Sequence, residues 1–145
     1  MHYFIRHYSE SDYDEMISLW EKTDMGGAFR GDNNEIIQST LDKGGELLLL
    51  IEKETGKIVG TSWITNDGRR LYLHHFGILP EYQGRGLSHY LIKDSLEVAK
   101  KLKLQIKLEV HQNNQTALNL YKKYGFKYLG DYDLYIIRDI ENIDL

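Results

Sequence analysis

The sequence predicts an α/β protein in which helices pack on a mixed, mostly antiparallel sheet. Residues 46–53, 58–65 and 71–79 are strand-like runs separated by turn residues, which is typical of an antiparallel meander. After Gly68 the expected order is strand, helix, strand, helix, so one neighbouring pair of strands should be parallel. With 145 residues, 41% hydrophobic and 28% charged, the chain is expected to form a single domain over residues 1–145.

The N-terminal part predicts a strand over residues 3–8 and then an amphipathic helix. Residues 9–12 offer N-cap side chains for that helix. Its apolar residues recur at i, i+3, i+4 and i+7, so that one face packs on a core. They are Tyr13, Met16, Ile17 and Trp20. The glycines that follow end this pattern.

A second, short helix is expected before residue 45. Asp32 and, three residues later, Glu35 form a capping-box pattern at its start. The pair Gly44–Gly45 stands where the helix should end, because glycine is favoured just past a helix C-terminus.

Three consecutive strands then form the predicted meander. Residues 47–51 are a purely apolar run, short and well bounded, as in a buried strand. Residues 58–65 and 71–79 flank Asn66-Asp67-Gly68, and Asp-Gly is a strong hairpin signal. This part of the sheet is therefore expected to be antiparallel.

The remaining elements alternate between helix and strand. A helix is expected from Leu87 to about Leu102, then a strand over 104–110 and a helix over 117–124 that starts from asparagine caps. Gly125 stands where a left-handed C-terminal cap would lie. A last pair of strands is expected to close the chain.

Composition narrows the functions open to the chain. It has no cysteine, which excludes disulfides, thiolate chemistry and cysteine-ligated zinc. A formal charge of −4 and a pI near 5.8 argue against binding to nucleic acid or to a membrane surface, and fit a cationic, amine-bearing substrate. With no long apolar run and no signal-peptide pattern, a cytoplasmic location is expected.

The loop over residues 83–86, Gln-Gly-Arg-Gly, is a candidate phosphate site. Backbone N–H groups and a helix N-terminus can surround an anion there, because glycine keeps side chains out of the way. The loop is neither a dinucleotide fingerprint, since His89 takes the third glycine position, nor a Walker loop, which needs a Lys-Ser or Lys-Thr pair. A purely structural glycine loop is the alternative interpretation.

Two segments resemble the GNAT superfamily of N-acetyltransferases. Residues 78–88, ILPEYQGRGLS, resemble its motif A, with Ser88 in place of the last small residue. Residues 108–126 are similar to its motif B almost position by position, and one helix plus one strand separates the motifs, as in the family. The resemblance implies the GNAT-like fold, an antiparallel N-terminal meander followed by a splayed pair of parallel strands.

The resemblance also implies acetyl-CoA as cosubstrate and no metal. The pyrophosphate would lie on the amides of the glycine loop, and pantetheine would pair with the preceding strand. The implied binding residues are Phe76, Gly77, Ile78, Gln83, Gly84, Arg85, Gly86, Leu87, Ser88 and His89. Asn114 is either a further contact or only a helix cap. Gly77 is a candidate for a β-bulge that frees backbone groups.

Acetyl transfer to an amine needs a proton for the departing thiolate. The resemblance gives this role to Tyr121. Helical periodicity alone favours another interpretation, in which Tyr121 shares a core stripe with Ala117, Leu120 and Tyr124.

The base is left open between two residues. Glu109 aligns with the motif B glutamate of ribosomal-protein-type N-terminal acetyltransferases, and partial desolvation near CoA would suit it to the role. His74 matches the position of a glutamate base in some lysine acetyltransferases of the family, and imidazole titrates near neutrality. His75, expected on the opposite strand face from His74, and His111 are held in reserve.

The acceptor is not specified by the sequence. A protein N-terminus, a lysine, a polyamine, an aminoglycoside or another small amine would fit, and a homodimer is compatible with the chain. Candidates to shape the acceptor pocket are Trp20, Phe29, Arg30 and Trp63, although aromatic residues are more often core. The rival functions are a non-catalytic acyl-CoA-binding module and a transferase for a longer acyl group.

Overall fold

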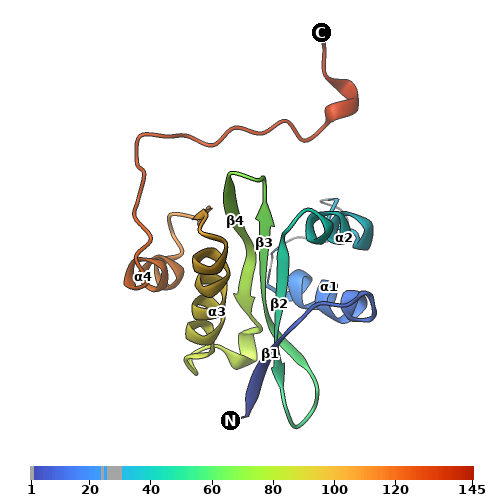
Figure 1. The fold of residues 1–145 in the computed structure, drawn as a ribbon, viewed down its shortest axis with the longest axis vertical. Coiled ribbons are helices and arrows are strands. Elements are labelled where there is room, and N and C mark those ends of the chain that lie inside the picture. Colours follow the sequence, from blue (N-terminus) through green and yellow to red (C-terminus); the bar gives the residue numbers. More distant parts are fainter. Residues whose placement is uncertain (1, 24, 26–30) are drawn as a thin grey trace.

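The computed structural model describes residues 2–23, 25 and 31–145, which form a five-stranded sheet with helices on both faces (Figure 1). The strands are β1 (Tyr3–His7), β2 (Glu46–Glu52), β3 (Ile58–Asn66), β4 (Arg70–Ile78) and β5 (Gln105–Leu108). They lie side by side in sequence order. β1 to β4 pair antiparallel and β4 pairs with β5 in parallel, so the predicted mixed sheet is confirmed.

Side chains of β3 alternate between the two helical layers. α1 (Tyr13–Lys22) and α2 (Asn34–Asp42) cover one face, and α3 (Leu87–Leu102) and α4 (Gln115–Lys123) cover the other (Figure 1). Trp63 donates a hydrogen bond to Thr40 of α2, whereas its neighbour Ser62 bonds Ser95 of α3. A strand presents successive side chains to opposite faces, so both layers pack against β3.

The two sides of the sheet differ in how well their cores are closed. The cluster that includes the α1 and α2 face has 17 buried apolar residues. The cluster around β5, α3 and α4 has six buried and eleven partly buried apolar residues. The C-terminal side of the molecule is therefore the less completely packed one.

The start of α2 differs from the predicted capping box. Asn33, not Asp32, is the N-cap, and its side chain accepts a hydrogen bond from the Ile36 N–H at 2.9 Å. Asn33 has the extended backbone conformation of a cap, with φ −84° and ψ 172°. The Asp32 carboxylate instead lies 3.1 Å from Nε2 of His75 in β4.

The expected last pair of strands is absent from the part of the chain that the structure describes. After Phe126 the chain runs extended and exposed as far as η4 (Ile140–Asn142), leaving the end of α4 and crossing the top of the molecule (Figure 1). β5 is also shorter than predicted, covering residues 105–108 rather than 104–110. A strand needs a hydrogen-bonding partner, and among the described residues none pairs with the backbone of residues 127–139.

Candidate active site

β4 and β5 separate halfway along β4. Their ladder pairs Arg70–Leu73 with Gln105–Leu108, whereas β4 continues to Ile78. Within the described chain, residues 74–78 thus have no strand neighbour on the β5 side, and an extended ligand could pair there. We call this unpaired stretch of β4, residues 74–78, the opening. Residues 76–78, which were predicted to bind pantetheine, all lie in it.

The glycine loop lies next to this opening and leads directly into α3. It follows the 3-10 helix η3 (Pro80–Tyr82). Gly84 and Gly86 have φ values of 77° and 75°, a left-handed conformation that favours glycine. A Cβ on either would meet nothing within 4 Å, so the space beside both is open. Nε2 of Gln83 donates to the Ile78 carbonyl at 2.9 Å and fastens the loop to the end of β4.

The N-terminus of α3 is well suited to an anion. In the described structure no side chain caps it at Gly86, and its first turn contains no acidic residue. The amides of Leu87 and Ser88 are among the helix N–H groups that lack an intrahelical partner, and the helix dipole adds positive charge. The residues present therefore fit a pyrophosphate.

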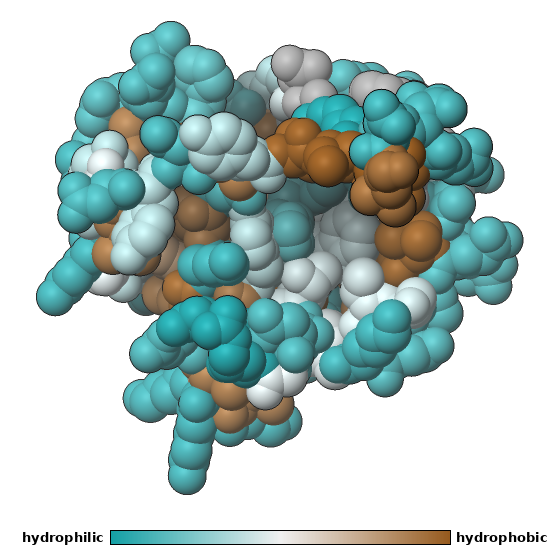
Figure 2. All heavy atoms as spheres, turned by 90° about the horizontal axis from the view of Figure 1, so that it is seen from above, coloured by the Kyte–Doolittle hydropathy of each residue, from teal (hydrophilic) through white to brown (hydrophobic). Residues whose placement is uncertain are grey.

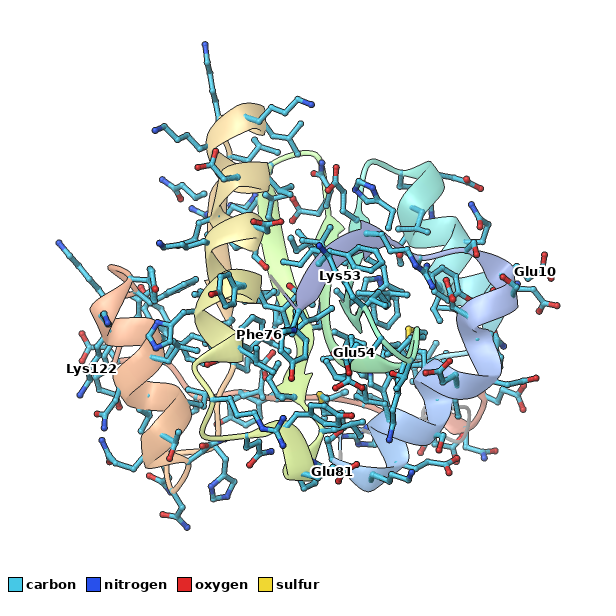
Figure 3. All side chains as sticks on the ribbon, turned by 90° about the horizontal axis from the view of Figure 1, so that it is seen from below. Glu10, Lys53, Glu54, Phe76, Glu81 and Lys122 are labelled. Atoms are coloured by element: carbon cyan, nitrogen blue, oxygen red, sulfur yellow. The ribbon has the colours of Figure 1, made fainter. Side chains whose placement is uncertain are left out.

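We call residues 83–89, the predicted pyrophosphate site, the glycine cradle. The side chains of two of these residues, Arg85 and His89, pack against neighbouring elements. The Arg85 guanidinium lies 4.9 Å from the Tyr82 ring centroid and donates to the Glu81 carbonyl at 3.0 Å. Nδ1 of His89 lies 2.8 Å from the Tyr124 hydroxyl and so joins α3 to α4. Figure 3 views this end of the molecule, with Glu81 at the edge of the view and Phe76 near its centre, between the α3 and α1 sides.

Tyr121 of α4 lies against the opening. Its ring centroid is 5.9 Å from that of Phe76 in β4 and 5.6 Å from that of Phe126. A Schellman motif fixes this end of α4: Gly125, with φ 97°, donates to the Lys122 carbonyl at 3.1 Å, and Phe126 donates to the Tyr121 carbonyl at 3.0 Å. The predicted left-handed cap at Gly125 is therefore confirmed.

Burial raises the pKa of Tyr121 to about 12. The phenol is therefore neutral near pH 7 and carries a proton that it can donate. The side chain is 8% exposed and belongs to the second apolar cluster. The core interpretation of Tyr121 is thus correct, and it is compatible with a place beside the opening.

β4 carries a β-bulge at residues 75–76, one position before the predicted Gly77. The pairing of β4 with β3 shifts by one residue between Thr61 and Trp63. His75 has φ 43°, which is uncommon for a residue with a side chain. The bulge lies at the start of the opening, where β4 loses its β5 neighbour.

Side chains from three elements hold the bulge in place. The Thr61 hydroxyl donates to the His75 carbonyl at 2.6 Å and accepts from Nε1 of Trp20 at 2.9 Å. Nε2 of His75 lies 3.1 Å from Asp32. If Asp32 is a carboxylate, the proton belongs on Nε2, and Nδ1 keeps its lone pair. That Nδ1 atom is buried and has no hydrogen-bond partner among the described residues.

His74 and His75 lie on the same face of the sheet, so the expected opposite orientation is wrong. Their ring centroids are 6.4 Å apart, and both rings lie near Trp63, at 6.0 and 5.1 Å. The left-handed conformation of His75 interrupts the alternation of a regular strand. Both imidazoles consequently lie on the α1 and α2 side, whereas Tyr121 lies on the other side.

His74 is held in a largely buried position. Its ring stacks on Tyr72 at 4.1 Å, and Nε2 is 2.9 Å from the Thr65 hydroxyl. Burial and the neighbouring His75 lower the pKa of His74 to about 4, although Asp32 acts in the opposite direction. His74 is therefore neutral at pH 7 but only a weak base.

The other polar candidates lie between β5 and α4. Glu109 is exposed just past the end of β5. Asn114 is the N-cap of α4 and accepts from the Ala117 N–H at 3.2 Å. Nδ1 of His111 accepts from the Asn113 N–H at 3.1 Å in the preceding turn.

The aromatic candidates for the acceptor pocket are core residues. Trp20 and Trp63 stack with ring centroids 5.6 Å apart and are 0% and 3% exposed. Trp20 also packs 4.2 Å from the ring of His75 and so supports the bulge. Phe29 and Arg30 lie outside the described residues.

The sequence analysis did not predict the contacts of Asp32 and Thr61 with the bulge beside the candidate site. Their contacts with His75 join positions 43 and 14 residues apart, so no local spacing could indicate them. The one available signal was Thr61 itself, a hydroxyl within an otherwise buried strand that requires a partner.

Metal-ligand groups and membrane-spanning helices are both absent from the described residues. Across the described residues, no three His, Asp or Glu side chains are grouped so that they could hold a metal ion. No helix in that part of the chain is both long and apolar enough to cross a bilayer.

The separation of β4 from β5 lies beside a glycine loop with an open helix N-terminus, a geometry that fits an extended, phosphate-bearing substrate. Residues 6–126 match the acetyltransferase (GNAT) family. The match covers most of the chain, which therefore belongs to this family of enzymes.

Solved structures share the fold. An acetyltransferase from Streptococcus agalactiae superposes with a TM-score of 0.78 at 21% identity, over 96% of this chain and 93% of that one. A GNAT family acetyltransferase from Elizabethkingia anophelis with acetyl-CoA bound gives 0.63 at 21% identity, over 87% and 76%. The ribosomal-protein-S18-alanine N-acetyltransferase of Escherichia coli gives 0.72 at 19% identity, over 86% and 77%. At these identities the likeness shows the fold.

Proposed function

We propose that this protein is an acetyl-CoA-dependent N-acetyltransferase that acts on a primary amine, from a small molecule or a protein. The observation that carries the proposal is the meeting of three features at one opening: the glycine cradle, the unpaired stretch of β4, and Tyr121. Family membership and the acetyl-CoA bound to the E. anophelis protein support it.

The donor is proposed to bind along the opening. Its pyrophosphate lies on the amides of residues 84–89, where an anion meets the α3 N-terminus. Its pantetheine arm pairs with the backbone of residues 76–78 as an added strand would. Asn114 is a further proposed contact near the end of that arm.

The proposed reaction is direct transfer. The amine nitrogen attacks the thioester carbonyl carbon, a C–N bond forms, and the C–S bond breaks. The departing thiolate takes the phenolic proton of Tyr121, which the pKa of about 12 keeps in place until then. The amine gives its proton to a base. With no cysteine in the chain, a cysteinyl intermediate is excluded.

Three residues are proposed as alternatives for the base. Glu109 and His74 are the residues that the sequence analysis named, but Glu109 is exposed and the pKa of His74 is low. His75 has the most suitable geometry, because Asp32 orients its ring and leaves Nδ1 as an acceptor with no partner in the described part of the chain. We favour His75, which acts from the α1 and α2 side while Tyr121 acts from the other side.

Calorimetric titration with acetyl-CoA tests the proposal. The parent should bind, and Gly86→Glu should abolish binding because it places a negative charge in the cradle. Gly56→Glu is the matched control: Gly56 has φ 73° and equally open surroundings, but lies in the β2–β3 turn. It should bind as the parent does, whereas a folded parent that does not bind would overturn the proposal. An amine panel monitored by release of free CoA thiol then identifies the acceptor.

A further inference from the structure

Gly77 of β4 is not a glycine because of its backbone conformation. Unlike Gly84 and Gly86, it lies outside the left-handed region, and the left-handed residue of the bulge is His75. A Cβ added at Gly77 would lie 2.7 Å from Cε and 3.3 Å from Sδ of Met25. Glycine within a strand often marks such a close approach. The missing side chain of Gly77 thus leaves the space that the Met25 thioether occupies.

The end of α1 positions Met25. Its backbone N–H donates to the Trp20 carbonyl at 2.9 Å, and the Thr23 hydroxyl donates to the Leu19 carbonyl at 2.8 Å. The Met25 side chain is partly buried and packs against the apolar cluster that includes the α1 and α2 face. Trp20 also packs 4.2 Å from the ring of His75. The same turn of α1 therefore supports both Met25 and the bulge.

Under the proposed function, the contact of Met25 with Gly77 lies beside the acyl group of the donor. Pantetheine pairs with residues 76–78, so the thioester at the end of the arm lies next to the bulge. Phe76 and Tyr121, with ring centroids 5.9 Å apart, close the α3 and α4 side. An acyl chain longer than acetyl would therefore extend toward the α1 and α2 side, which Met25 occupies.

Apolar surface by itself would favour a longer acyl chain, since each added methylene gains free energy when it leaves water. Such surface is available, because apolar side chains lie open around a hollow when the molecule is seen from above (Figure 2). A donor site that selects acetyl therefore needs an obstacle at the point where the chain would lengthen. The thioether of Met25 is such an obstacle, because it already fills the room beside Gly77.

On the basis of the proposed function, we propose that Met25 restricts the donor to acetyl-CoA, and that Gly77 provides the space for its thioether. Acetyl ends in a single methyl group and stops short of Met25, whereas butyryl extends two carbons further and meets Sδ and Cε. Packed side chains accommodate an added methylene only at a cost. Propionyl is an intermediate case, because the flexible methionine side chain can move aside in part. Met25 is thus a specificity-determining residue for the same reaction.

Calorimetric titration with acetyl-CoA, propionyl-CoA and butyryl-CoA tests the proposal without an acceptor. The parent should bind butyryl-CoA roughly tenfold or more weakly than acetyl-CoA. In Met25→Ala this difference should fall to about twofold or less, because the obstacle is gone. Met25→Leu, of similar volume, should keep the parent's preference. So should Leu102→Ala, which removes a 42% exposed side chain at the far end of α3 from the glycine cradle.

A double variant shows whether the space beside Gly77 is responsible. A Cβ at this position points at the atoms that Met25→Ala removes. Met25→Ala combined with Gly77→Ala should therefore restore part of the preference for acetyl-CoA. If thermal unfolding shows that Met25→Ala does not fold, Met25→Val takes its place, with a smaller expected loss of preference.

The parent and the variants give separate outcomes for the donor preference and for the proposed function. A parent that binds acetyl-CoA and butyryl-CoA equally well, or a folded Met25→Ala that keeps the parent's preference, overturns the role of Met25 and leaves the proposed function standing. A folded parent that binds none of the three esters overturns the proposed function, and the role of Met25 with it.

Discussion

The glycine cradle and the bulge of β4 lie at the same opening but are built in different ways. In the cradle, left-handed backbone falls on glycines, Gly84 and Gly86, and the space beside them is open. In the bulge, left-handed backbone falls on His75, and contacts from Thr61 and Asp32 hold it. A site formed by the backbone is visible in the sequence, whereas one held by tertiary contacts is not.

The largest expected effect concerns the acid beside the bulge. Tyr121→Phe should lower kcat by about 10²–10⁴-fold, because a proton donor is lost while the ring remains. Its Kd for acetyl-CoA should stay within about twofold of the parent value, since the cradle is unchanged. Steady-state kinetics and calorimetry measure the two quantities. Tyr124→Phe, at the C-cap that follows α4, is the control and should keep its kcat. A parent-like kcat in Tyr121→Phe would remove the acid role.

The second-largest effect on activity is expected from His75, the residue in the bulge of β4. His75→Gln should lower kcat/KM by roughly 10²-fold, because the proposed base is lost. Asp32→Asn should lower kcat/KM by less, through the change in the preferred tautomer of His75. His74→Gln is the control and should keep the parent value. If His74→Gln or Glu109→Gln lowers kcat/KM by this amount and His75→Gln does not, the base has been misassigned.

The low pKa of His74 makes stability depend on pH. The ordinary value is 6.5 and the folded value is about 4, so between these values the unfolded state binds more protons than the folded state. Stability should therefore fall as pH drops from about 6.5 to about 4, by about 2 kcal/mol after allowance for partial solvent access. Urea unfolding at several pH values measures this slope. His74→Gln should flatten it, and an unchanged slope in that variant would rule out His74 as the cause.

The smallest effect separates conformation from binding in the cradle. Gly86→Ala and Gly56→Ala should each cost about 1 kcal/mol of unfolding free energy, because both glycines have positive φ. Only Gly86→Ala should also weaken acetyl-CoA binding. Thermal or urea unfolding beside calorimetry tests the pair, and equal affinities in the two variants would mean that the cradle does not touch the ligand.

Local patterns predicted most of the fold. Apolar runs bounded by turn residues gave β2, β3 and β4, and helical spacing gave α1 and α3, because each pattern reflects which side of one element is buried. The last pair of strands was wrong for a different reason. Residues 128–137 have strand-forming side chains, but a strand requires an edge to pair with, and propensity does not supply that edge.

The features of the candidate site also fall into two groups, those that local sequence patterns predicted and those that depend on tertiary contacts. The left-handed backbone of the glycine loop and the cap at Gly125 were predictable because glycine marks this backbone conformation directly. The bulge was expected at Gly77 for that reason and lies instead at His75. Asp32 was taken for a helix cap because Asp is a good cap, but its neighbour Asn33 fills that position and leaves the carboxylate for His75.

The separation of β4 from β5 also has a kinetic consequence under the proposed function. The donor lies along the opening on the Tyr121 side, and the acceptor reaches it from the His75 side, so neither substrate blocks the entry of the other. Under the proposed direct transfer both substrates must be bound before acetyl moves, because the amine itself attacks the thioester. Double-reciprocal plots of rate against either substrate should then intersect rather than run parallel, the pattern of a ternary complex.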